Sequence, residues 1–454
     1  MRGVATARLL GALALGTVTL GRPGAAGLQE PPAAAGTPAS PAAPSEPIIR
    51  IVGTARPRIP IAIPEFPPPG GDAHLTEIAR TIHDVLRDDL DFSGYFALVP
   101  EEYYKLVHDA GDRRVAYKEW LGVGAESLLL GKVSLEPPIV VFEGKLYDTT
   151  SQKMTLGKRY RGEEDLTRLL AHRLSDEIVS QSNQQGIAQS RIAYVSQIGK
   201  AKEIFIMDYD GARAKRITAN GTINLSPAWS PDGREIAFVS YRGGGPELML
   251  MNSAGELRRA FPQGEELNSA PAWSPDGRLL AFSSSRDGNA EIYTLRVADG
   301  TLTRLTRNDA IDTSPSWAPS GREIAFTSDR TGTPQIYLMD AEGANVRRLT
   351  FDVSYCDAAS WSPLGDRIAF TARQPGGFDI YVKNLGTGEL RQLTRDTNIN
   401  EWPRWSPDGR HLVFASNRSG NFDVYTMDAD GIADGARVHR LTHGGNSYSP
   451  SWSR

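Results

Sequence analysis

Residues 316–326, with the sequence SWAPSGREIAF, contain a pattern that recurs at a fixed interval through the second half of the chain. A proline and a glycine follow the tryptophan in a short turn, and apolar residues alternate with polar ones after the turn. This combination predicts a β-hairpin, because proline and glycine supply the backbone angles that a tight connection requires. The repeated tryptophans stand 44 residues apart, at Trp229, Trp273, Trp317, Trp361 and Trp405.

Each repeat is long enough for four short strands. In the third repeat, strands are expected at residues 323–327, 335–339 and 346–350, after the strand that ends at Trp317. Four strands in a unit of about 40 to 50 residues are typical of a propeller blade, which buries its faces only against neighbouring blades. The repeats therefore predict an all-β propeller.

The two ends of the repeat region predict how the propeller closes. Trp452 is a sixth tryptophan close to the last residue, and residues 191–196 resemble the second strand of a blade that lacks its tryptophan strand. We expect residues 449–453 to pair with strands from 191–218, because such pairing leaves no open sheet edge. The prediction is a six-bladed propeller over residues 187–454, closed by its N- and C-terminal strands.

Residues 48–186 predict a separate α/β domain with a mixed sheet. Asp72 is expected to cap a helix with one apolar face, which includes Leu75 and Ile82, and a second amphipathic helix is expected at residues 164–182. Shorter helical stretches are expected at 101–107 and 113–121. Strands are expected at 59–63, 95–99, 127–135, 139–147 and 154–160.

The N-terminal residues read as an export signal. Arg2 and Arg8 flank an apolar run over residues 9–20, and small residues follow it. A run of about 12 residues is too short to span a bilayer, so we expect a cleaved signal peptide over residues 1–27. A Pro/Ala-rich linker is expected at 28–47. The protein is thus expected outside the cytoplasm, with no insertion into the membrane.

Composition restricts the partners. The net charge of −4 and the pI of about 6.1 give no basic field for nucleic acid, so protein or small-molecule partners are expected. The sequence has no Gly-x-Ser-x-Gly, no phosphate-binding Gly-x-x-x-x-Gly-Lys-Ser/Thr and no His-Glu-x-x-His, which predicts no enzyme activity and no cofactor. Cys356 is the only cysteine and is expected to be a packed residue rather than a reactive thiol.

Two patterns resemble metal sites only superficially. His439 and His443 are four residues apart, but a strand followed by a loop does not place them on one face. The segments 208–211 and 428–431 echo a calcium loop but fall at hairpin turns. We therefore expect no metal site.

The segments just before each tryptophan strand differ from repeat to repeat, and all of them open on one mouth of the propeller. Variation within regular repeats is typical of a binding surface. Trp402 stands where other repeats have Ser or Ala, and it is either an anchor for a partner or packed within its own blade. Arginines recur on the same side, either as a ring for an acidic partner or as ties to carboxylates such as Asp312 and Asp357; they are Arg242, Arg286, Arg330, Arg373 and Arg418.

The combination of signal peptide, α/β domain and six-bladed propeller resembles the TolB family, the periplasmic components of the Tol-Pal system of Gram-negative bacteria. The resemblance covers residues 48–454. Its most specific parts are 122–133, 191–195, 208–211 and the Ser-Pro-Ala-Trp-Ser-Pro-Asp-Gly run at 226–233.

The resemblance implies a non-enzymatic adaptor, monomeric when alone, that supports outer-membrane integrity and constriction during cell division. It implies that a Pal-like lipoprotein binds at the propeller mouth and that a TolA-like protein binds the N-terminal segment Ile49, Arg50, Ile51 and Val52, where strand addition suits an extended segment. The candidate mouth residues are Asn224, Leu267, Asn268, Ala270, Asp312, Thr313, Asp357, Glu401 and Trp402.

Two other function classes stay open. A propeller that binds a sugar or another small ligand would line its pocket with aromatic rings, for which Tyr355, Trp402 and Tyr448 are candidates. A periplasmic lyase or hydrolase would need clustered histidines or carboxylates in the channel, and the repeats show no histidine cluster.

Overall fold

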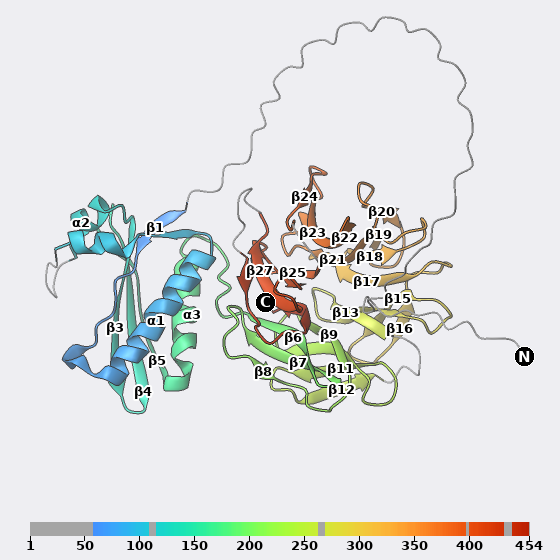
Figure 1. Cartoon of the computed structure of the whole chain (residues 1–454), viewed down its shortest axis with the longest axis horizontal. Coiled ribbons are helices and arrows are strands. Elements are labelled where there is room, and N and C mark those ends of the chain that lie inside the picture. The colour runs from blue at the N-terminus through green and yellow to red at the C-terminus, as the bar shows by residue number, and fades with distance from the viewer. Residues whose placement is uncertain (1–57, 109–114, 262–267, 396–398, 431–437, 454) are drawn as a thin grey trace, which may run out of the picture. The chain divides into compact units, whose positions relative to one another are not determined.

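The computed structural model describes residues 58–108, 115–261, 268–395, 399–430 and 438–453. Within them, an α/β domain with a mixed sheet is followed by a propeller of six four-stranded sheets (Figure 1), which confirms the predicted fold class. The expected signal peptide and linker lie outside the described residues. Among the helices of the described part, none is long and apolar enough to cross a membrane.

The α/β domain is built on a five-stranded sheet with the order β2-β1-β3-β4-β5. The strand β1 (Ile59–Ala62) is second in this order and pairs in parallel with β2 (Phe96–Leu98) on one side and with β3 (Ser127–Glu136) on the other. The strands β3, β4 (Ile139–Asp148) and β5 (Lys153–Glu163) form an antiparallel meander. Short connections join the antiparallel strands, whereas the parallel pairs need longer crossovers that hold the helices.

Two helices pack against each other and share one core with the sheet. The helix α1 (Ala73–Phe92) begins at Asp72, whose carboxylate accepts hydrogen bonds from the backbone N–H groups of His74 (2.9 Å) and Leu75 (3.1 Å), as predicted. The helix α3 (Thr167–Ser180) begins later than expected, because residues 164–166 form a 3-10 turn, η3 (Glu164–Leu166). The remaining short helices are η1 (Pro69–Gly71), η2 (Glu101–Leu106) and α2 (Tyr117–Gly122).

In each propeller sheet the first strand lies innermost, against the first strands of the two neighbouring sheets. Three sheets are β9 (Asn224–Trp229), β10 (Glu235–Ser240), β11 (Glu247–Asn252) and β12 (Leu257–Phe261); β13 (Asn268–Trp273), β14 (Leu279–Ser284), β15 (Glu291–Arg296) and β16 (Leu302–Arg304); and β17 (Asp312–Trp317), β18 (Glu323–Ser328), β19 (Gln335–Asp340) and β20 (Arg347–Arg348). The others are β21 (Cys356–Trp361), β22 (Arg367–Gln374), β23 (Gly377–Asn384) and β24 (Leu390–Gln392); β25 (Asn400–Trp405), β26 (His411–Ser416), β27 (Asp423–Asp428) and β28 (His439–Arg440); and β29 (Ser447–Trp452), β6 (Arg191–Ile198), β7 (Ala201–Asp208) and β8 (Lys215–Arg216).

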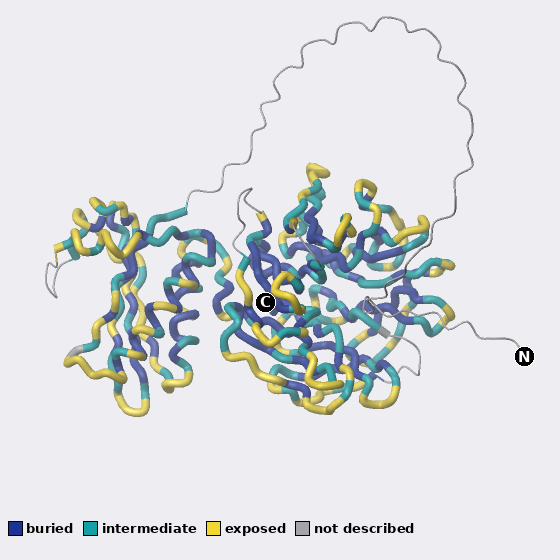
Figure 2. The backbone as a smooth tube through the Cα atoms, viewed as in Figure 1, coloured by how far each residue is buried: buried dark blue, intermediate teal, exposed yellow. Residues whose placement is uncertain are grey.

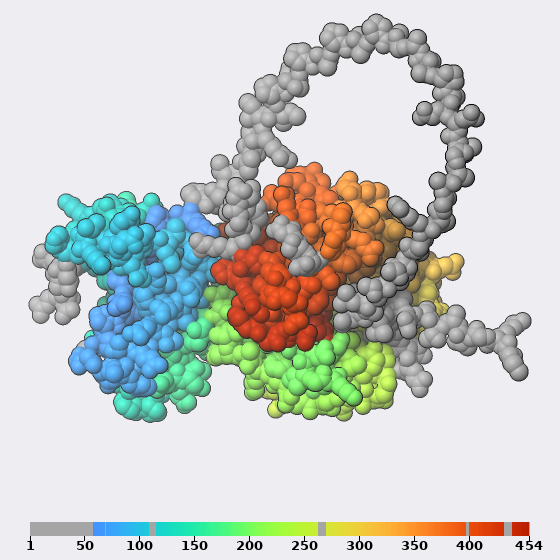
Figure 3. All heavy atoms as spheres, viewed as in Figure 1, coloured from blue at the N-terminus to red at the C-terminus, as the bar shows by residue number. Residues whose placement is uncertain are grey.

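The last of these sheets confirms the predicted closure. The strand β29 pairs antiparallel with β6, with Trp452 opposite Ile192. The Arg191 N–H donates to Ser453 Oγ at 2.7 Å, and Trp452 Nε1 donates to Ser190 Oγ at 2.8 Å. In Figure 3 the red C-terminal atoms lie directly beside the green atoms of this sheet. The two ends of the repeat region therefore share one blade.

The outermost strands are shorter than the repeats predict. The fourth strand of the third repeat was expected at 346–350, but β20 contains only Arg347 and Arg348. The side chains there are exposed or half-buried, so the edge gains little from apolar packing (Figure 2). Short, charged edge strands also keep the rim of each blade from pairing with other chains.

The core between blades repeats with the sequence. Phe282, Phe326, Phe370 and Phe414 are fully buried and stand 44 residues apart, each beside a tyrosine of the adjacent strand. Burying one such side chain contributes about 2 to 3 kcal/mol. Because these rings fix the spacing of the blades, the mouth loops stand on a rigid frame.

Candidate partner-binding mouth of the propeller

Every inner strand carries a bulge at the mouth where it begins. Its pairing with the second strand shifts register there, and the residue three positions before the tryptophan adopts a left-handed backbone conformation. Residues other than glycine rarely adopt this backbone conformation, and a residue with a bulky side chain is unusual there. The φ angles are 51° at Ser226, 50° at Ala270, 52° at Ser314, 55° at Ala358, 56° at Trp402 and 49° at Ser449.

The bulge decides which residues reach the mouth. The first residue of an inner strand points inward, as Asn224 and Asp312 do, and both are fully buried. The second residue is accessible at its edge, as Thr313 and Glu401 are. Trp402 is also half-buried because it occupies the bulge itself. The mouth is therefore formed mainly by the second and third residues of each inner strand.

Asn224 is bonded to the preceding blade, and Asp312 is bonded to the loop after the second strand of its own blade. The Asn224 Nδ2 group donates to the Lys202 carbonyl oxygen at 3.0 Å and to Glu203 Oε2 at 3.2 Å. The Asp312 carboxylate accepts from Arg330 Nη2 at 2.9 and 3.1 Å. Side chains with these partners support the mouth from within rather than contact solvent.

The remaining predicted residues fall into two groups. One group comes from four blades and is brought together at this mouth: Ala270, Thr313, Asp357, Glu401 and Trp402. The bulge residue next to Asp357, Ala358, is buried. Leu267 and the N-terminal segment Ile49, Arg50, Ile51 and Val52 lie outside the described residues. Of Asn268 only the backbone is described, where it pairs with Ser284.

Four further residues belong to the variable segments before the tryptophan strands, but the sequence analysis did not include them among the candidate partner-binding residues. Leu225, Ser269, Ser314 and Tyr448 are half-buried at the same mouth, at the second or third position of their inner strands. The signal was available in the alignment of the repeats, because the bulge falls at a fixed distance from each tryptophan.

Two acidic residues, Asp357 on β21 and Glu401 on β25, interact electrostatically at the variable mouth. The Asp357 Oδ1 atom accepts hydrogen bonds from Ser314 Oγ at 3.1 Å and Thr327 Oγ1 at 2.8 Å. Burial, together with the charge of Asp357, raises the pKa of Glu401 to about 7. The mouth therefore carries a carboxyl group whose charge changes near neutral pH.

One arc of the mouth is aromatic. The Trp402 ring lies 6.0 Å from the Tyr448 ring and 6.1 Å from the Phe422 ring, measured between centroids. Lys202 Nζ lies 4.9 Å from the centre of the Tyr448 ring. Trp402 thus packs against its own blade and the next one while it stays partly accessible, so the two alternatives predicted for it are not exclusive.

The repeated arginines are tied into the blades. Arg330 binds Asp312, and Arg418 Nη2 donates to Asn400 Oδ1 at 3.0 Å. The Arg373 guanidinium lies 5.4 Å from the centre of the Tyr355 ring. The bond between Arg330 and Asp312 confirms that this arginine is tied to a carboxylate of the propeller, which was one of the two alternatives. Asp357 was expected to bind an arginine in the same way, but its carboxylate accepts from hydroxyl groups.

The opposite mouth contrasts with this one. A cavity of about 190 Å³ there is lined by residues that every repeat supplies, above all the tryptophans and the prolines that follow them. Some of the indoles are bonded to the frame: Trp273 Nε1 donates to the Ala228 carbonyl oxygen at 3.0 Å, and Trp405 Nε1 donates to that of Ser360 at 2.9 Å. The Nε1 atoms of Trp229 and Trp317 are buried without a hydrogen-bond partner within the described part of the chain. The side chains that differ between repeats therefore lie at the variable mouth.

Both domains match known families. Residues 47–155 match the TolB amino-terminal domain, and residues 181–374 and 352–454 match the TolB beta propeller domain. The crystal structure of TolB from Acinetobacter baumannii superposes with a TM-score of 0.76 and 28% sequence identity, over 88% of this chain and 97% of that chain.

Two curated relatives carry the name Tol-Pal system protein TolB. The relative from Desulfosudis oleivorans is 37% identical over 190 residues, which is 41% of this chain and 43% of that protein. The relative from Syntrophotalea carbinolica is 38% identical over 166 residues, 36% of this chain and 39% of that protein. The aligned segments thus span about two fifths of these relatives. With its amino-terminal domain and its propeller both matched, the chain belongs to the TolB family.

Proposed function

We propose that this chain is a non-enzymatic periplasmic adaptor of the Tol-Pal envelope system. Its propeller mouth binds a Pal-like lipoprotein, and its N-terminal segment at residues 49–52 binds a TolA-like inner-membrane protein. Through these contacts it supports outer-membrane integrity and constriction during cell division. The names of its relatives support the system, and the geometry of the mouth supports the mode of binding.

The observation that carries the proposal is the contrast between the two mouths. One is lined by repeated tryptophans and prolines, and the other by side chains that differ in every blade, such as Thr313, Glu401 and Trp402. A surface with an aromatic anchor, hydroxyl groups and an acidic centre suits a folded protein partner, because anchors of this kind dominate binding energy at interfaces. The described mouth residues offer carboxylates and aromatic rings but no histidine, which supports a binding role over a lyase.

Calorimetric titration with the soluble domain of Pal from the same organism tests this proposal. We expect saturable one-to-one binding that Thr313→Arg abolishes, because the new side chain would fill the mouth. Arg278→Ala is the control, since this exposed arginine lies on the turn after Trp273, at the opposite mouth. Absence of binding to the folded protein, or equal loss with both variants, would contradict the proposal.

A second candidate function rests on the aromatic arc. The neighbouring rings of Trp402 and Tyr448, tilted by 44° to each other, and the carboxyl group of Glu401 are also suited to a sugar or another small ligand. Titration of the same preparation with a panel of sugars distinguishes the two, because a sugar site would show heat without any protein partner.

A further inference from the structure

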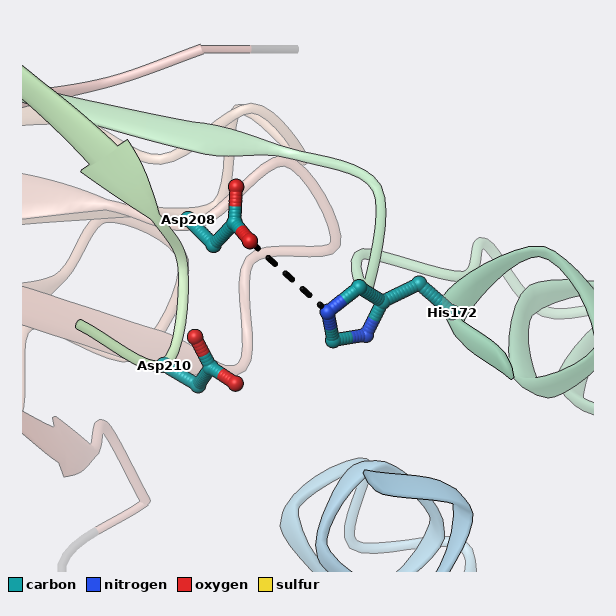
Figure 4. Close-up of side chains that lie close together, drawn as sticks. All are labelled: His172, Asp208 and Asp210. Carbon is teal, nitrogen blue, oxygen red and sulfur yellow. Dashed lines mark ion pairs between the residues drawn. The ribbon is translucent and has the colours of Figure 1, made fainter. Parts of the chain in front are cut away.

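A buried polar cluster joins two helices of the α/β domain to the turn after β7 in the propeller. His172 on α3 is at its centre and is only 1% exposed. Its Nδ1 atom lies 2.9 Å from Asp89 Oδ2 on α1. Its Nε2 atom lies 3.9 Å from Asp208 Oδ2 at the end of β7, as Figure 4 shows together with Asp210. One imidazole therefore lies between carboxylates of the two domains.

The bonds to Asp89 identify the proton on Nδ1. Tyr209, in the same propeller turn, is 2% exposed and donates its hydroxyl to Asp89 Oδ1 at 2.6 Å. Asp89 is 4% exposed, and burial raises its pKa, but the hydrogen bonds of His172 and Tyr209 act in the opposite direction because they favour the ionised carboxylate, which can only accept. His172 Nδ1 therefore carries a proton, and the state of Nε2 is what can change.

The Nε2 atom is buried without a hydrogen-bond partner. In a neutral imidazole with its proton on Nδ1, this atom would turn a lone pair towards the Asp208 carboxylate, which is unfavourable in a buried site. In an imidazolium, Nε2 carries a proton and attracts Asp208 across the domain boundary. The geometry thus favours the charged form.

The surrounding charges lead to the same conclusion. Arg213 binds Asp208 through Nε at 2.7 Å and Nη2 at 2.9 Å, and Arg168 on α3 binds Asp210. The cluster has three carboxylates, those of Asp89, Asp208 and Asp210, but only these two guanidinium groups. One carboxylate therefore lacks a counter-charge unless His172 is protonated. Asp88 on α1, Asp176 on α3 and Arg191 on β6 lie around the cluster and interact with its members electrostatically.

These effects act on His172 in opposite directions. Burial alone would lower the pKa of His172, but the hydrogen bond and charge of Asp89, with a contribution from Asp210, raise it above its ordinary value. The net rise in the pKa of His172 agrees with the arrangement of the charges around it.

A divalent cation is the alternative occupant. One ligand atom each from His172, Asp208 and Asp210 lies within 4.8 Å of the others, which a metal ion would accept. The two carboxylates are already held by Arg213 and Arg168, however, so an ion would have to compete with both guanidinium groups. A proton on Nε2 displaces nothing.

We propose that His172 is a proton-dependent latch between the two domains, in which its imidazolium joins Asp89 of α1 to Asp208 of the propeller. The latch is fully formed below the ordinary histidine pKa of about 6.5 and is lost as the pH rises through the raised pKa of the folded protein. The proposal concerns the junction between the domains and holds whichever partner binds at the mouth.

Hydrogen–deuterium exchange of the full chain between pH 6 and pH 8.5, corrected for intrinsic exchange rates, tests the latch. We expect the amides of the 208–213 turn and of the last turns of α3 to exchange roughly fivefold more slowly at pH 6. His172→Asn should remove this difference, because its amide can still donate to Asp89 but does not titrate. His74→Asn is the matched control, since His74 is an exposed histidine paired with Glu164.

Histidine NMR gives a readout that a loss of folding cannot mimic. The signal that His172→Asn removes should titrate above the ordinary value, and Asp89→Asn should lower that midpoint. A midpoint at or below 6.5, unchanged pH dependence in His172→Asn, or a metal ion that remains with the purified protein and is released by a chelator would each overturn the proposal.

Discussion

The Trp402 indole lies 6.0 Å from the Tyr448 ring and so links the inner strands β25 and β29 at the variable mouth. The contact crosses from one blade to the next and leaves Trp402 half-buried, in a left-handed backbone conformation with a φ of 56°. The other blades place Ser or Ala at this position, so the fold itself does not require an aromatic side chain there.

Trp402→Ser should therefore weaken binding of the Pal-like domain about tenfold, or about 1.4 kcal/mol, with little change in melting temperature. Serine already occupies the equivalent bulge in three blades, at Ser226, Ser314 and Ser449. Calorimetric titration measures the affinity. Leu364→Ser removes a 63% exposed apolar side chain from a turn at the opposite mouth and should leave the affinity unchanged. Equal effects of the two changes would argue against this anchor.

Glu401→Gln should stabilise the protein at pH 8.5 but not at pH 5. The pKa of Glu401 is raised to about 7 in the folded protein, so the native state binds the extra proton and stability falls as the pH rises from about 4.5 to 7. Above pH 7 the variant avoids a partly buried charge beside Asp357, worth about 1 to 2 kcal/mol after allowance for solvent screening. Thermal melts at both pH values measure this difference, and Glu342→Gln, at an exposed position, should show none.

Asp312→Asn should cost only about 1 kcal/mol, whereas Asp312→Ala should cost about 3 kcal/mol. Alanine leaves the guanidinium of Arg330 without its buried partner. Asparagine can replace the carboxylate, because Asn400 occupies the equivalent position and accepts from Arg418 at 3.0 Å. Urea unfolding measures both variants, and an equal loss for the two would contradict this account of the arginines.

Cys356 should react with a thiol reagent only when the protein unfolds. The side chain is fully buried, and burial raises the pKa of its thiol to about 12, so almost no thiolate is present near neutral pH. Labelling with a chromogenic disulfide should be very slow in buffer and stoichiometric in denaturant. Rapid labelling of the native protein would show that the strand β21 opens readily.

Deletion of residues 446–454 should open the ring, because β6 would lose its antiparallel partner β29. We expect the loss of the cooperative melting transition of the propeller. A chain that ends at Ser453 retains the strand and its bond to Arg191 and serves as the control. A truncated protein that melts like the full chain would show that the pairing is dispensable.

The architecture was predictable from the sequence because it depends on repetition. The 44-residue spacing places a similar Pro/Gly turn and a phenylalanine in five blades, and the unpaired remnants at 191–196 and 449–453 reveal the shared blade, where Tyr194 replaces the phenylalanine. The cap of α1 and the apolar faces of α1 and α3 were predictable because they depend on local patterns, whereas the start of α3 was predicted at residue 164 and lies at Thr167.

The mouth was only partly predictable. Asn224 and Asp312 occupy variable segments, but the backbone bulge turns them inward and exposes their neighbours. The sequence analysis interpreted Asp208 and Asp210 as turn residues, and the turn exists, with the Gly211 N–H bonded to the Asp208 carbonyl oxygen. Their contact with His172 depends on how two domains pack, and no local pattern encodes that.

The blade shared by β29 and β6 has a further consequence for the kinetics of folding. Ser447 and Ser196 are partners although 251 residues separate them, and Trp452 and Ser190 are 262 residues apart, so the ring closes through contacts between residues that are very distant in sequence. Loop-closure entropy makes such a contact slow to form, and it becomes available only when the final strand has been synthesised. Until then every nascent chain carries an unpaired strand edge in β6. Any chaperone or export machinery that handles the protein must protect that edge.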